Sequence, residues 1–321
     1  MSKQHYLVVG ARGFIGAWVC RLLVEEGVRV TATDASPDPR SVDCVLSQRH
    51  LDSIDFRVSD ARDPEATEKV VGDAITNVVY LAGLLRPASE QNPLLNSQVS
   101  VGGLINVLNA SAKRKGQMGL AYASTAAVYG PADNYPGKRV DAASRADPRD
   151  HYGVTRYAME MTAAVYARDN GVRSVGLRPW VVYGAGRFNG LTAQPSLAML
   201  AAAGDVPFQM AFGGRIVIHH AREVAKAFIE SARADLQGAA IANIPGDSIE
   251  MNELIDVIAK CAPASRGKIT CSPKRSGGIE AVDDPRLEKI IGPLPALTEQ
   301  RVGETIEDYR QLLADRKVTL P

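Results

Sequence analysis

A glycine-rich turn near the N-terminus is the feature that most limits how this chain can fold. An apolar run at residues 6–9 leads into GARGFIG, residues 10–16, whose later glycines stand three and six positions after the first. Apolar residues at helical spacing follow over residues 14–26, so the pattern predicts a strand, a tight turn and a helix. The first glycine permits the bend, the second lets backbone approach a pyrophosphate, and the third allows close packing. We therefore predict dinucleotide binding at this helix N-terminus, with contacts from Gly10, Arg12, Gly13, Phe14, Ile15 and Gly16.

Two acidic residues at the ends of later strands bear on which dinucleotide binds. Asp34 follows a β-branched run at residues 28–33, where a carboxylate accepts hydrogen bonds from ribose hydroxyls and repels a 2′-phosphate. Asp34 therefore favours NAD over NADP, although Arg12 inside the turn favours a phosphate. Asp60 ends the third apolar run and is expected to bind the adenine amino group; the alternative is a solvated loop carboxylate.

Strand and helix patterns continue to alternate along the chain. Strands are expected at residues 55–59, 77–83, 119–124 and 172–177, and helices at 94–115 and 151–170. This alternation is typical of a doubly wound parallel sheet. We therefore expect an α/β fold: a Rossmann-type NAD-binding domain over residues 1–178, to which residues 215–235 return, and a smaller C-terminal substrate-binding lobe over residues 179–214 and 236–321.

Charge and cysteine content exclude several classes of protein. The formal net charge is +1 without any block of Lys and Arg, so neither nucleic acid nor an anionic membrane is expected as a partner. No apolar run approaches the ~20 residues of a membrane span. The four cysteines lack zinc-site spacing and are expected to be reduced thiols, which favours a cytoplasmic location. His219 and His220 are adjacent in a strand-like stretch and point to opposite faces, so no metal site is expected.

The segment HYGVTRYAME, residues 151–160, places Tyr152 and Arg156 one helical turn apart on the same face. A free phenol has a pKa of about 10, so a tyrosine that removes a hydroxyl proton at neutral pH needs a fixed cation nearby. A cation at position 156 can reach both the phenol and a nicotinamide ribose. The alternative for a tyrosine and a threonine in such a chain is core packing.

Several motifs together resemble one known family. GARGFIG, Asp34, NVVYLAG (77–83), STAAVYG (124–130), YGVTRYAME (152–160) and LRPWVVYG (177–184) have the order and rough spacing of the extended short-chain dehydrogenase/reductase family of NAD-dependent epimerases and dehydratases. The resemblance covers essentially the whole chain. It implies that Tyr152 is the general base, that Thr125, or Ser124 as the fallback, holds the substrate oxygen, and that NAD takes the hydride.

The resemblance implies two further properties of the chain. One is a homodimer in which residues 94–115 and 151–170 of both copies pack as a four-helix bundle; internal packing would equally explain the apolar stripes of these helices. The other is a wider set of cofactor contacts, namely Ala61, Leu81, Ala82, Gly83, Tyr152, Arg156 and Pro179.

Arg156 departs from the family, which has lysine at this position. Arginine keeps the charge, but it is longer, planar and effectively never deprotonated, so the exchange is not conservative. Activity is expected to survive in weakened form. If the guanidinium cannot share its donors between ribose and phenol, the chain would be a sensor or scaffold that binds NAD without catalysis.

The substrate is less constrained than the cofactor. Val181 stands where nucleotide-sugar enzymes of the family usually have asparagine, Ser100 stands where a structural asparagine is common, and Arg215 is close to a diphosphate-binding arginine without aligning. These departures favour a smaller or less phosphorylated hydroxyl compound over a UDP-sugar. We expect an epimerase, dehydratase or dehydrogenase acting on a secondary hydroxyl of a sugar-like substrate, or alternatively a dehydrogenase of a small non-nucleotide compound. The candidate substrate residues are Leu84, Leu85, Arg86, Thr125, Val181, Tyr183, Arg187, Asn189 and Arg215.

Overall fold

A seven-stranded parallel sheet forms the centre of the molecule. The computed structural model describes residues 4–36, 38–114, 117–141, 143–296 and 298–321. Its main sheet has the strand order β11-β7-β5-β4-β1-β2-β3, and all pairs are parallel; Val8, for example, lies between Ala32 and Val79 of the neighbouring strands. The strands are β1 (His5–Val9), β2 (Arg29–Asp34), β3 (Ile54–Val58), β4 (Asn77–Tyr80), β5 (Gly119–Ala123), β7 (Ser174–Arg178) and β11 (Ala239–Asn243).

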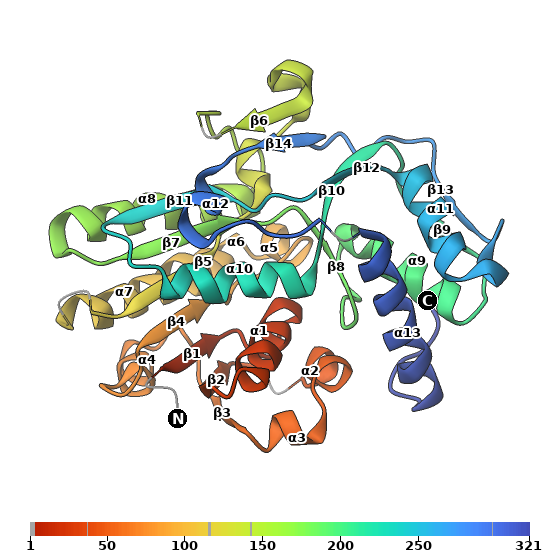
Figure 1. Cartoon of the computed structure of the whole chain (residues 1–321). Coiled ribbons are helices and arrows are strands. Elements are labelled where there is room, and N and C mark those ends of the chain that lie inside the picture. The colour runs from red at the N-terminus through yellow and green to blue at the C-terminus, as the bar shows by residue number, and fades with distance from the viewer. Residues whose placement is uncertain (1–3, 37, 115–116, 142, 297) are drawn as a thin grey trace.

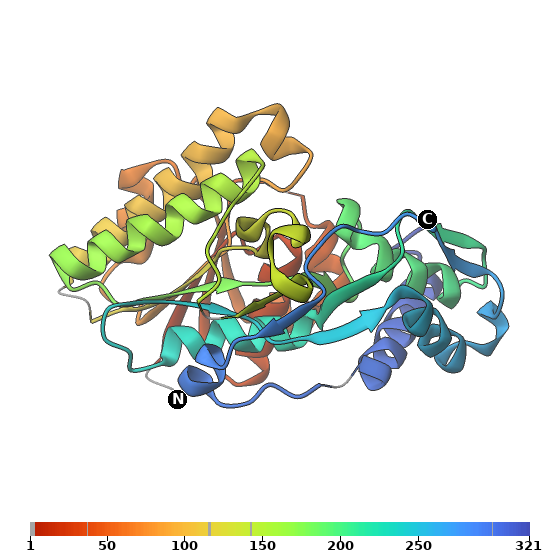
Figure 2. The same cartoon turned by 90° about the horizontal axis from the view of Figure 1, so that it is seen from above.

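Helices cover both faces of this sheet, as expected for a doubly wound fold (Figure 1). One face carries α1 (Phe14–Glu25), α10 (Ala221–Arg233) and α12 (Arg286–Ile291), whose apolar residues share a core with Val8, Ala121 and Val175. The other face carries α4 (Pro64–Val71), α7 (Gly103–Lys113) and α8 (His151–Asn170), which pack on Leu7, Val78 and Leu120. Figure 2 shows α7 and α8 side by side on one face with α10 on the other. The predicted fold class is therefore confirmed.

The helix expected over residues 94–115 is interrupted. The structure has α6 (Pro93–Ser97), a π-helical turn η1 (Gln98–Gly102) and then α7. The Tyr80 hydroxyl donates a hydrogen bond of 2.5 Å to the Val99 carbonyl within this turn. A side chain at Gly103 would stand 2.1 Å from the same hydroxyl, so glycine is needed where the helix meets the tyrosine. Such π-turns are often found at functional sites.

A smaller lobe lies at the carboxyl end of the main sheet and contains three further sheets. These are β12-β10-β8, β13-β9 and β14-β6. Their strands are β6 (Arg139–Asp141), β8 (Val181–Tyr183), β9 (Phe208–Met210), β10 (Arg215–His220), β12 (Asp247–Glu250), β13 (Ile269–Cys271) and β14 (Ala281–Asp283). The lobe's helices are α9 (Gln194–Ala203), α11 (Met251–Cys261) and α13 (Thr298–Ala314). The remaining short helices are α2 (Arg40–Val45), α3 (Gln48–Leu51), α5 (Ala88–Gln91), η2 (Ala126–Tyr129), η3 (Ala132–Asn134), η4 (Pro136–Lys138), η5 (Leu191–Ala193) and η6 (Pro263–Ser265).

Two segments exchange the places that the sequence predicts for them. Within residues 215–235, α10 does pack on the main sheet, but β10 pairs with β8 and β12 of the smaller lobe. The edge of the main sheet beside β7 is instead taken by β11, which lies inside the range 236–321 expected for the lobe. The sequence pattern did not identify β11 because AAIAN has few of the β-branched or aromatic residues that are typical of strands, whereas β10 has several.

None of the helices in the described ranges has the length and apolar character needed to cross a membrane. The described residues also contain no cluster of three or more His, Cys, Asp or Glu side chains placed to hold a metal ion.

Candidate active site

The glycine turn joins β1 to α1 at the carboxyl edge of the sheet. Gly10 has φ of +83°, and a side chain there would stand 2.8 Å from the Ala82 backbone nitrogen. A side chain at Gly16 would stand 2.3 Å from the Gly10 carbonyl oxygen, so strand and helix approach each other only because both positions are glycine. Gly13 is the N-cap residue of α1 and offers no capping side chain. The first backbone N–H groups of the helix are therefore left for an anion.

A cavity of about 500 Å³ opens over this turn. Leu85, Arg187 and Asn189, which the sequence predicts as substrate residues, line this cavity together with predicted cofactor residues. Ile15 and Gly16 are not among its lining residues: Ile15 packs from α1 against the core, and Gly16 allows strand and helix to approach closely. Pro179 lines a second cavity, which lies against Thr125 and the smaller lobe. The predicted cofactor residues that do line it are Gly10, Arg12, Gly13, Phe14, Asp34, Asp60, Ala61, Leu81, Ala82 and Gly83.

The two predicted acidic residues have different surroundings. Asp34 accepts hydrogen bonds from the backbone nitrogens of Arg12 (3.0 Å) and Ser36 (2.9 Å), which fixes its carboxylate at the cavity wall. Asp60 instead forms an ion pair of 2.6 Å with Arg62. Hydrogen bonds from the Arg62 side chain hold the pKa of Asp60 below its ordinary value. An adenine amino group would therefore have to share Asp60 with a guanidinium, a pairing that the sequence pattern did not reveal.

Changing Asp34 to asparagine should weaken NAD binding and relax discrimination against NADP. The change removes a charged acceptor and the repulsion of a 2′-phosphate, so we expect a loss of about tenfold in NAD affinity, from about 1.4 kcal/mol. Titration calorimetry with both cofactors measures the two dissociation constants. Asp169→Asn, which removes an exposed carboxylate on α8, is the matched control. Equal affinity of the unchanged protein for NAD and NADP would contradict this role of Asp34.

Two acceptors fix the start of α8, which carries Tyr152. Asp150, the N-cap residue, accepts a hydrogen bond of 2.7 Å from the Gly153 nitrogen, and Glu90 accepts from the nitrogens of His151 (3.1 Å) and Tyr152 (3.0 Å). A side chain at Gly153 would stand 2.7 Å from the Ala127 carbonyl oxygen. The helix therefore begins tightly packed against η2, the turn that follows Thr125.

Arg156 fits its position because its neighbours are small. Its side chain is buried, its guanidinium carbon lies 5.4 Å from the centre of the Tyr152 ring, and Nη1 donates a 2.8 Å hydrogen bond to the Ala123 carbonyl. The Cβ that Gly83 lacks would stand 2.3 Å from Nη2 of Arg156 and 2.7 Å from Oγ of Ser100. The guanidinium thus occupies space that only a glycine at position 83 leaves open. Nε of Arg156 is buried without a hydrogen-bond partner among the described residues.

The two candidate hydroxyls next to Tyr152 face different surroundings. The Ser124 hydroxyl is buried and donates to Glu160, so it lines neither cavity. Thr125 accepts a 3.2 Å hydrogen bond from the Ala127 nitrogen, and its side chain lines the second cavity. Of the two residues, the structure places only Thr125 where it could contact a substrate.

The second cavity, of about 480 Å³, lies against Thr125 and the smaller lobe. Predicted residues Arg86, Thr125 and Val181 line it, as does Pro179. Arg215 does not; it donates to the Ser248 carbonyl and lies near two glutamates. Tyr183 belongs to a third, smaller cavity beside His219 and His220. Lining residues that the sequence patterns missed are Arg149, Trp180, Thr192, Phe212, Lys274, Arg275 and Ile279.

Tyr152 and Arg156 lie behind the walls of these two cavities and are not lining residues of either. Arg156 contacts the first cavity through Gly83. The guanidinium carbon of Arg86, which lines the second, lies 6.0 Å from the centre of the Tyr152 ring. The Tyr152 ring therefore lies beside Arg86 of the second cavity and beside Arg156, which packs on Gly83 of the first.

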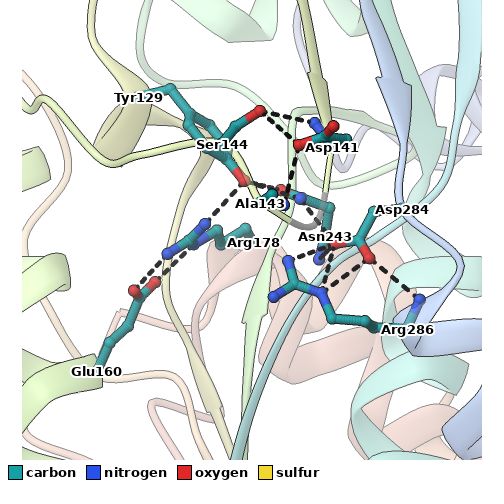
Figure 3. A network of polar contacts seen from close by, with 9 residues as sticks. All are labelled: Tyr129, Asp141, Ala143, Ser144, Glu160, Arg178, Asn243, Asp284 and Arg286. Atoms are coloured by element: carbon teal, nitrogen blue, oxygen red, sulfur yellow. Dashed lines mark hydrogen bonds and ion pairs between the residues drawn. The ribbon is translucent and has the colours of Figure 1, made fainter.

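A buried polar network (Figure 3) includes Tyr129, whose ring stacks on Trp180 in the wall of the second cavity. Arg178, the last residue of β7, forms an ion pair of 2.6 Å with Glu160 of α8 and donates a 2.7 Å hydrogen bond to the Tyr129 hydroxyl. Burial disfavours the Arg178 charge, but the hydrogen bonds and charge of Glu160 outweigh it and raise the pKa of Arg178. Asn243 of β11 continues the network from Tyr129 to Asp284. The network thus joins α8, two strands of the main sheet and the C-terminal segment.

The adjacent histidines have separate partners. His219 contacts the Pro245 carbonyl (3.1 Å) and the Trp180 nitrogen (3.2 Å), so it positions a residue of the second cavity. Burial lowers the pKa of His219 to about 4. His220 caps α10 and contacts Glu223 at 3.3 Å.

The doubly wound sheet and the glycine turn at its carboxyl edge define a Rossmann-type nucleotide-binding protein. The model of the NAD dependent epimerase/dehydratase family matches residues 6–238 of the chain. The chain therefore belongs to this family. The match confirms the resemblance that the motifs carry, and the family's cofactor is the NAD that the glycine turn and Asp34 predict.

Comparisons with individual proteins agree with this assignment. An uncharacterized 37.6 kDa protein of Escherichia coli O111:H- is 31% identical over 188 residues, 56% of this chain and 55% of that protein. UDP-glucuronate 4-epimerase 1 of Arabidopsis thaliana is 31% identical over 186 residues, 56% of this chain and 42% of that enzyme. The chain spans about half the length of the curated relatives it matches. The solved structure of UDP-N-acetylglucosamine 4-epimerase from Methanobrevibacter ruminantium M1 in complex with UDP-N-acetylmuramic acid covers 97% of this chain and 99% of its own, with a TM-score of 0.83 and 21% identity. At that identity the likeness shows the fold.

Proposed function

We propose that this protein is an NAD-dependent enzyme that oxidises a secondary hydroxyl of a sugar or sugar-like substrate, with Tyr152 as the general base. The observation that carries the proposal is that the Tyr152 ring lies 5.4 Å from the guanidinium of Arg156, which packs on Gly83 of the first cavity, and 6.0 Å from that of Arg86, which lines the second. The residues of the first cavity fit the cofactor: the turn at Gly10 and Gly16 admits no side chain, and Asp34 presents its carboxylate at the cavity wall.

The chemistry assigned to the chain's own residues is proton transfer and orientation. Bound NAD supplies the acceptor for the substrate hydride. Tyr152 is the general base that takes the hydroxyl proton, and the Arg156 guanidinium lies 5.4 Å from its ring. The Thr125 hydroxyl donates a hydrogen bond to the substrate oxygen and keeps that oxygen beside the phenol. Asp34 and the α1 N-terminus hold the ribose and pyrophosphate ends of the cofactor.

The charges around the second cavity support a substrate with few phosphates. Each of its three arginines has a carboxylate partner: Arg86 with Asp150 at 2.9 Å, Arg149 with Asp147 at 2.6 Å and Arg275 with Glu280 at 3.1 Å. Lys274 is the lining cation without an ion pair among the described residues. A UDP-sugar would bring two phosphate charges, whereas a sugar, polyol or sugar acid would suit this nearly balanced wall. The same balance of charges supports the alternative function, a dehydrogenase of a small non-nucleotide hydroxy compound.

A substrate panel tests the proposal and separates its versions. The protein is incubated with NAD and sugars, sugar acids, polyols and UDP-sugars, while absorbance at 340 nm and chromatography of the products are followed. A dehydrogenase accumulates NADH with substrate, and an epimerase or dehydratase forms a new product without net NADH. Binding of NAD without either signal, across the panel, would favour the sensor or scaffold alternative over catalysis.

We also propose that the protein is a cytoplasmic homodimer. The four cysteines carry free thiols, as proteins of a reducing compartment do. An apolar stripe on α8, formed by Val154, Met161 and Val165, is 51%, 46% and 44% exposed, and Leu94 of α6 beside it is 68% exposed. Exposed apolar patches of this kind mark protein interfaces.

A single charge in this stripe should convert the dimer to a monomer. Met161→Glu would place a carboxylate in the interface, and we expect the molar mass from light scattering after gel filtration to halve. Val58→Glu, at an apolar residue 73% exposed on β3, should leave the dimer intact. A wild-type protein that elutes as a monomer at high concentration would rule out the proposed assembly.

A further inference from the structure

Arg187 is a cation without an anionic partner in the wall of the first cavity. It lies in the loop between β8 and η5, and among the described residues no carboxylate is within ion-pairing distance of its guanidinium. Nη2 donates a 2.8 Å hydrogen bond to the Thr192 hydroxyl, and Nε is buried with no hydrogen-bond partner. Burial lowers the pKa of this guanidinium. Buried charges in proteins are normally paired, so this cation is expected to meet an anion that a ligand brings.

The position of Arg187 indicates which anion that is. Its guanidinium carbon lies 5.7 Å from the centre of the Phe14 ring, and Phe14 is the first residue of α1. The other cations of this cavity have partners of their own: Arg62 pairs with Asp60, and Arg12 lies over the Phe56 ring at 5.2 Å. The helix N-terminus offers only about half a unit charge to a pyrophosphate that carries two. A second positive group facing the same turn would complete the charge balance.

The loop that carries Arg187 is fixed from three sides. The indole of Trp18 in α1 donates to the Ala185 carbonyl (3.1 Å), the Ser41 hydroxyl in α2 donates to the Gly186 carbonyl (3.1 Å), and the Tyr309 hydroxyl in α13 donates to the Gly184 carbonyl (3.1 Å). These contacts come from both the main domain and the smaller lobe. They hold the three residues before Arg187 in place without using the donors of its guanidinium, which is therefore preorganised for a ligand.

We propose that Arg187 binds the pyrophosphate of the dinucleotide, opposite the N-terminus of α1, and thereby ties the smaller lobe to the cofactor. This assigns Arg187 to the cofactor, in place of the substrate role that the sequence predicts. The inference rests on the proposed NAD binding. The alternative source of an anion is a carboxylate or phosphate of the substrate, reached past Thr192, which lines the second cavity.

Titration calorimetry with NAD, ADP-ribose and adenosine tests this assignment without any need for turnover. Arg187→Met keeps most of the aliphatic stem over Phe14 and removes the charge. We expect the affinity for NAD and for ADP-ribose to fall by about tenfold to a hundredfold, because a charge-assisted hydrogen bond to phosphate is lost, while the affinity for adenosine stays within about twofold. Lys274→Met, which removes a cation of the second cavity, is the matched control and should leave all three affinities unchanged.

Each outcome decides between the alternatives. Unchanged binding of ADP-ribose by a folded Arg187→Met protein would overturn the inference and point to a substrate anion. If this variant does not fold, Arg187→Lys replaces it, and we expect a loss of a few fold for both pyrophosphate ligands and none for adenosine. A wild-type protein that binds neither NAD nor ADP-ribose would overturn the proposed function as well.

Discussion

Replacing Tyr152 by phenylalanine is expected to lower kcat/KM by about a thousandfold, because the change removes the only atom of the side chain that can take a proton. The ring remains in place next to Arg156 and Arg86, so the packing at the start of α8 should be preserved. Steady-state kinetics with the substrate that the hydroxyl panel identifies measure the effect. Cofactor affinity should change far less than kcat/KM, since the contacts proposed at the glycine turn, Asp34 and Arg187 are not altered.

Tyr166→Phe is the matched control for this experiment. Tyr166 lies on the same helix, and its hydroxyl donates a 2.7 Å hydrogen bond to Asn109 on the outside of the molecule. We expect this variant to keep its activity, so a general effect of removing a hydroxyl from α8 can be separated from loss of the base. Full turnover by Tyr152→Phe would show that another group removes the proton.

The sequence predicts local features of the fold well where backbone chemistry is decisive. Helix α8 begins and ends at the expected residues because Asp150 caps its first turn and Gly171, with φ of +65°, ends it. The glycine turn likewise lies between strand and helix as its spacing requires. These signals depend only on residues close together in the sequence, so they can be identified without a structure.

Contacts between distant segments are the part that the sequence does not predict. Lys274 and Arg275 reach the second cavity from the far end of the chain, and nothing in the residues around them indicates that they meet Thr125. Arg187 lies in a loop of the expected kind, but its place in the first cavity depends on contacts from α1, α2 and α13. The spacing of residues within one helix or strand cannot predict such contacts.

The exchange of lysine for arginine at position 156 illustrates the same limit. Taken alone, the longer guanidinium suggests a weakened site, and Ser100 suggests a lost support. In the structure Arg156 packs against Gly83 and donates to the Ala123 carbonyl, while the Ser100 hydroxyl donates to Asn96. The longer guanidinium is therefore accommodated by contacts with segments distant in the sequence, which only the fold reveals.

The largest loss of stability is expected from Glu160→Ala. The change leaves the Arg178 guanidinium buried without its carboxylate, and breaking one side of such a pair costs about 3–5 kcal/mol. Urea unfolding followed by circular dichroism measures the free energy of unfolding. Glu68→Ala is the matched control: its pair with Lys113 has the same 2.6 Å separation, but the two side chains are 58% and 62% exposed, against 0% and 8% for Glu160 and Arg178. We expect that control to cost less than about 1 kcal/mol.

Because the two pairs have equal length, burial alone separates their expected effects. The double variant Glu160→Met with Arg178→Met should recover part of the stability lost by Glu160→Ala, since it removes the buried charge that the single change leaves unpaired. Its catalytic rate should nevertheless stay low, because Arg178 also binds the Tyr129 hydroxyl, and the Tyr129 ring stacks on Trp180 in the wall of the second cavity. Equal losses of stability for Glu160→Ala and Glu68→Ala would mean that the network of Figure 3 does not hold α8 against the sheet.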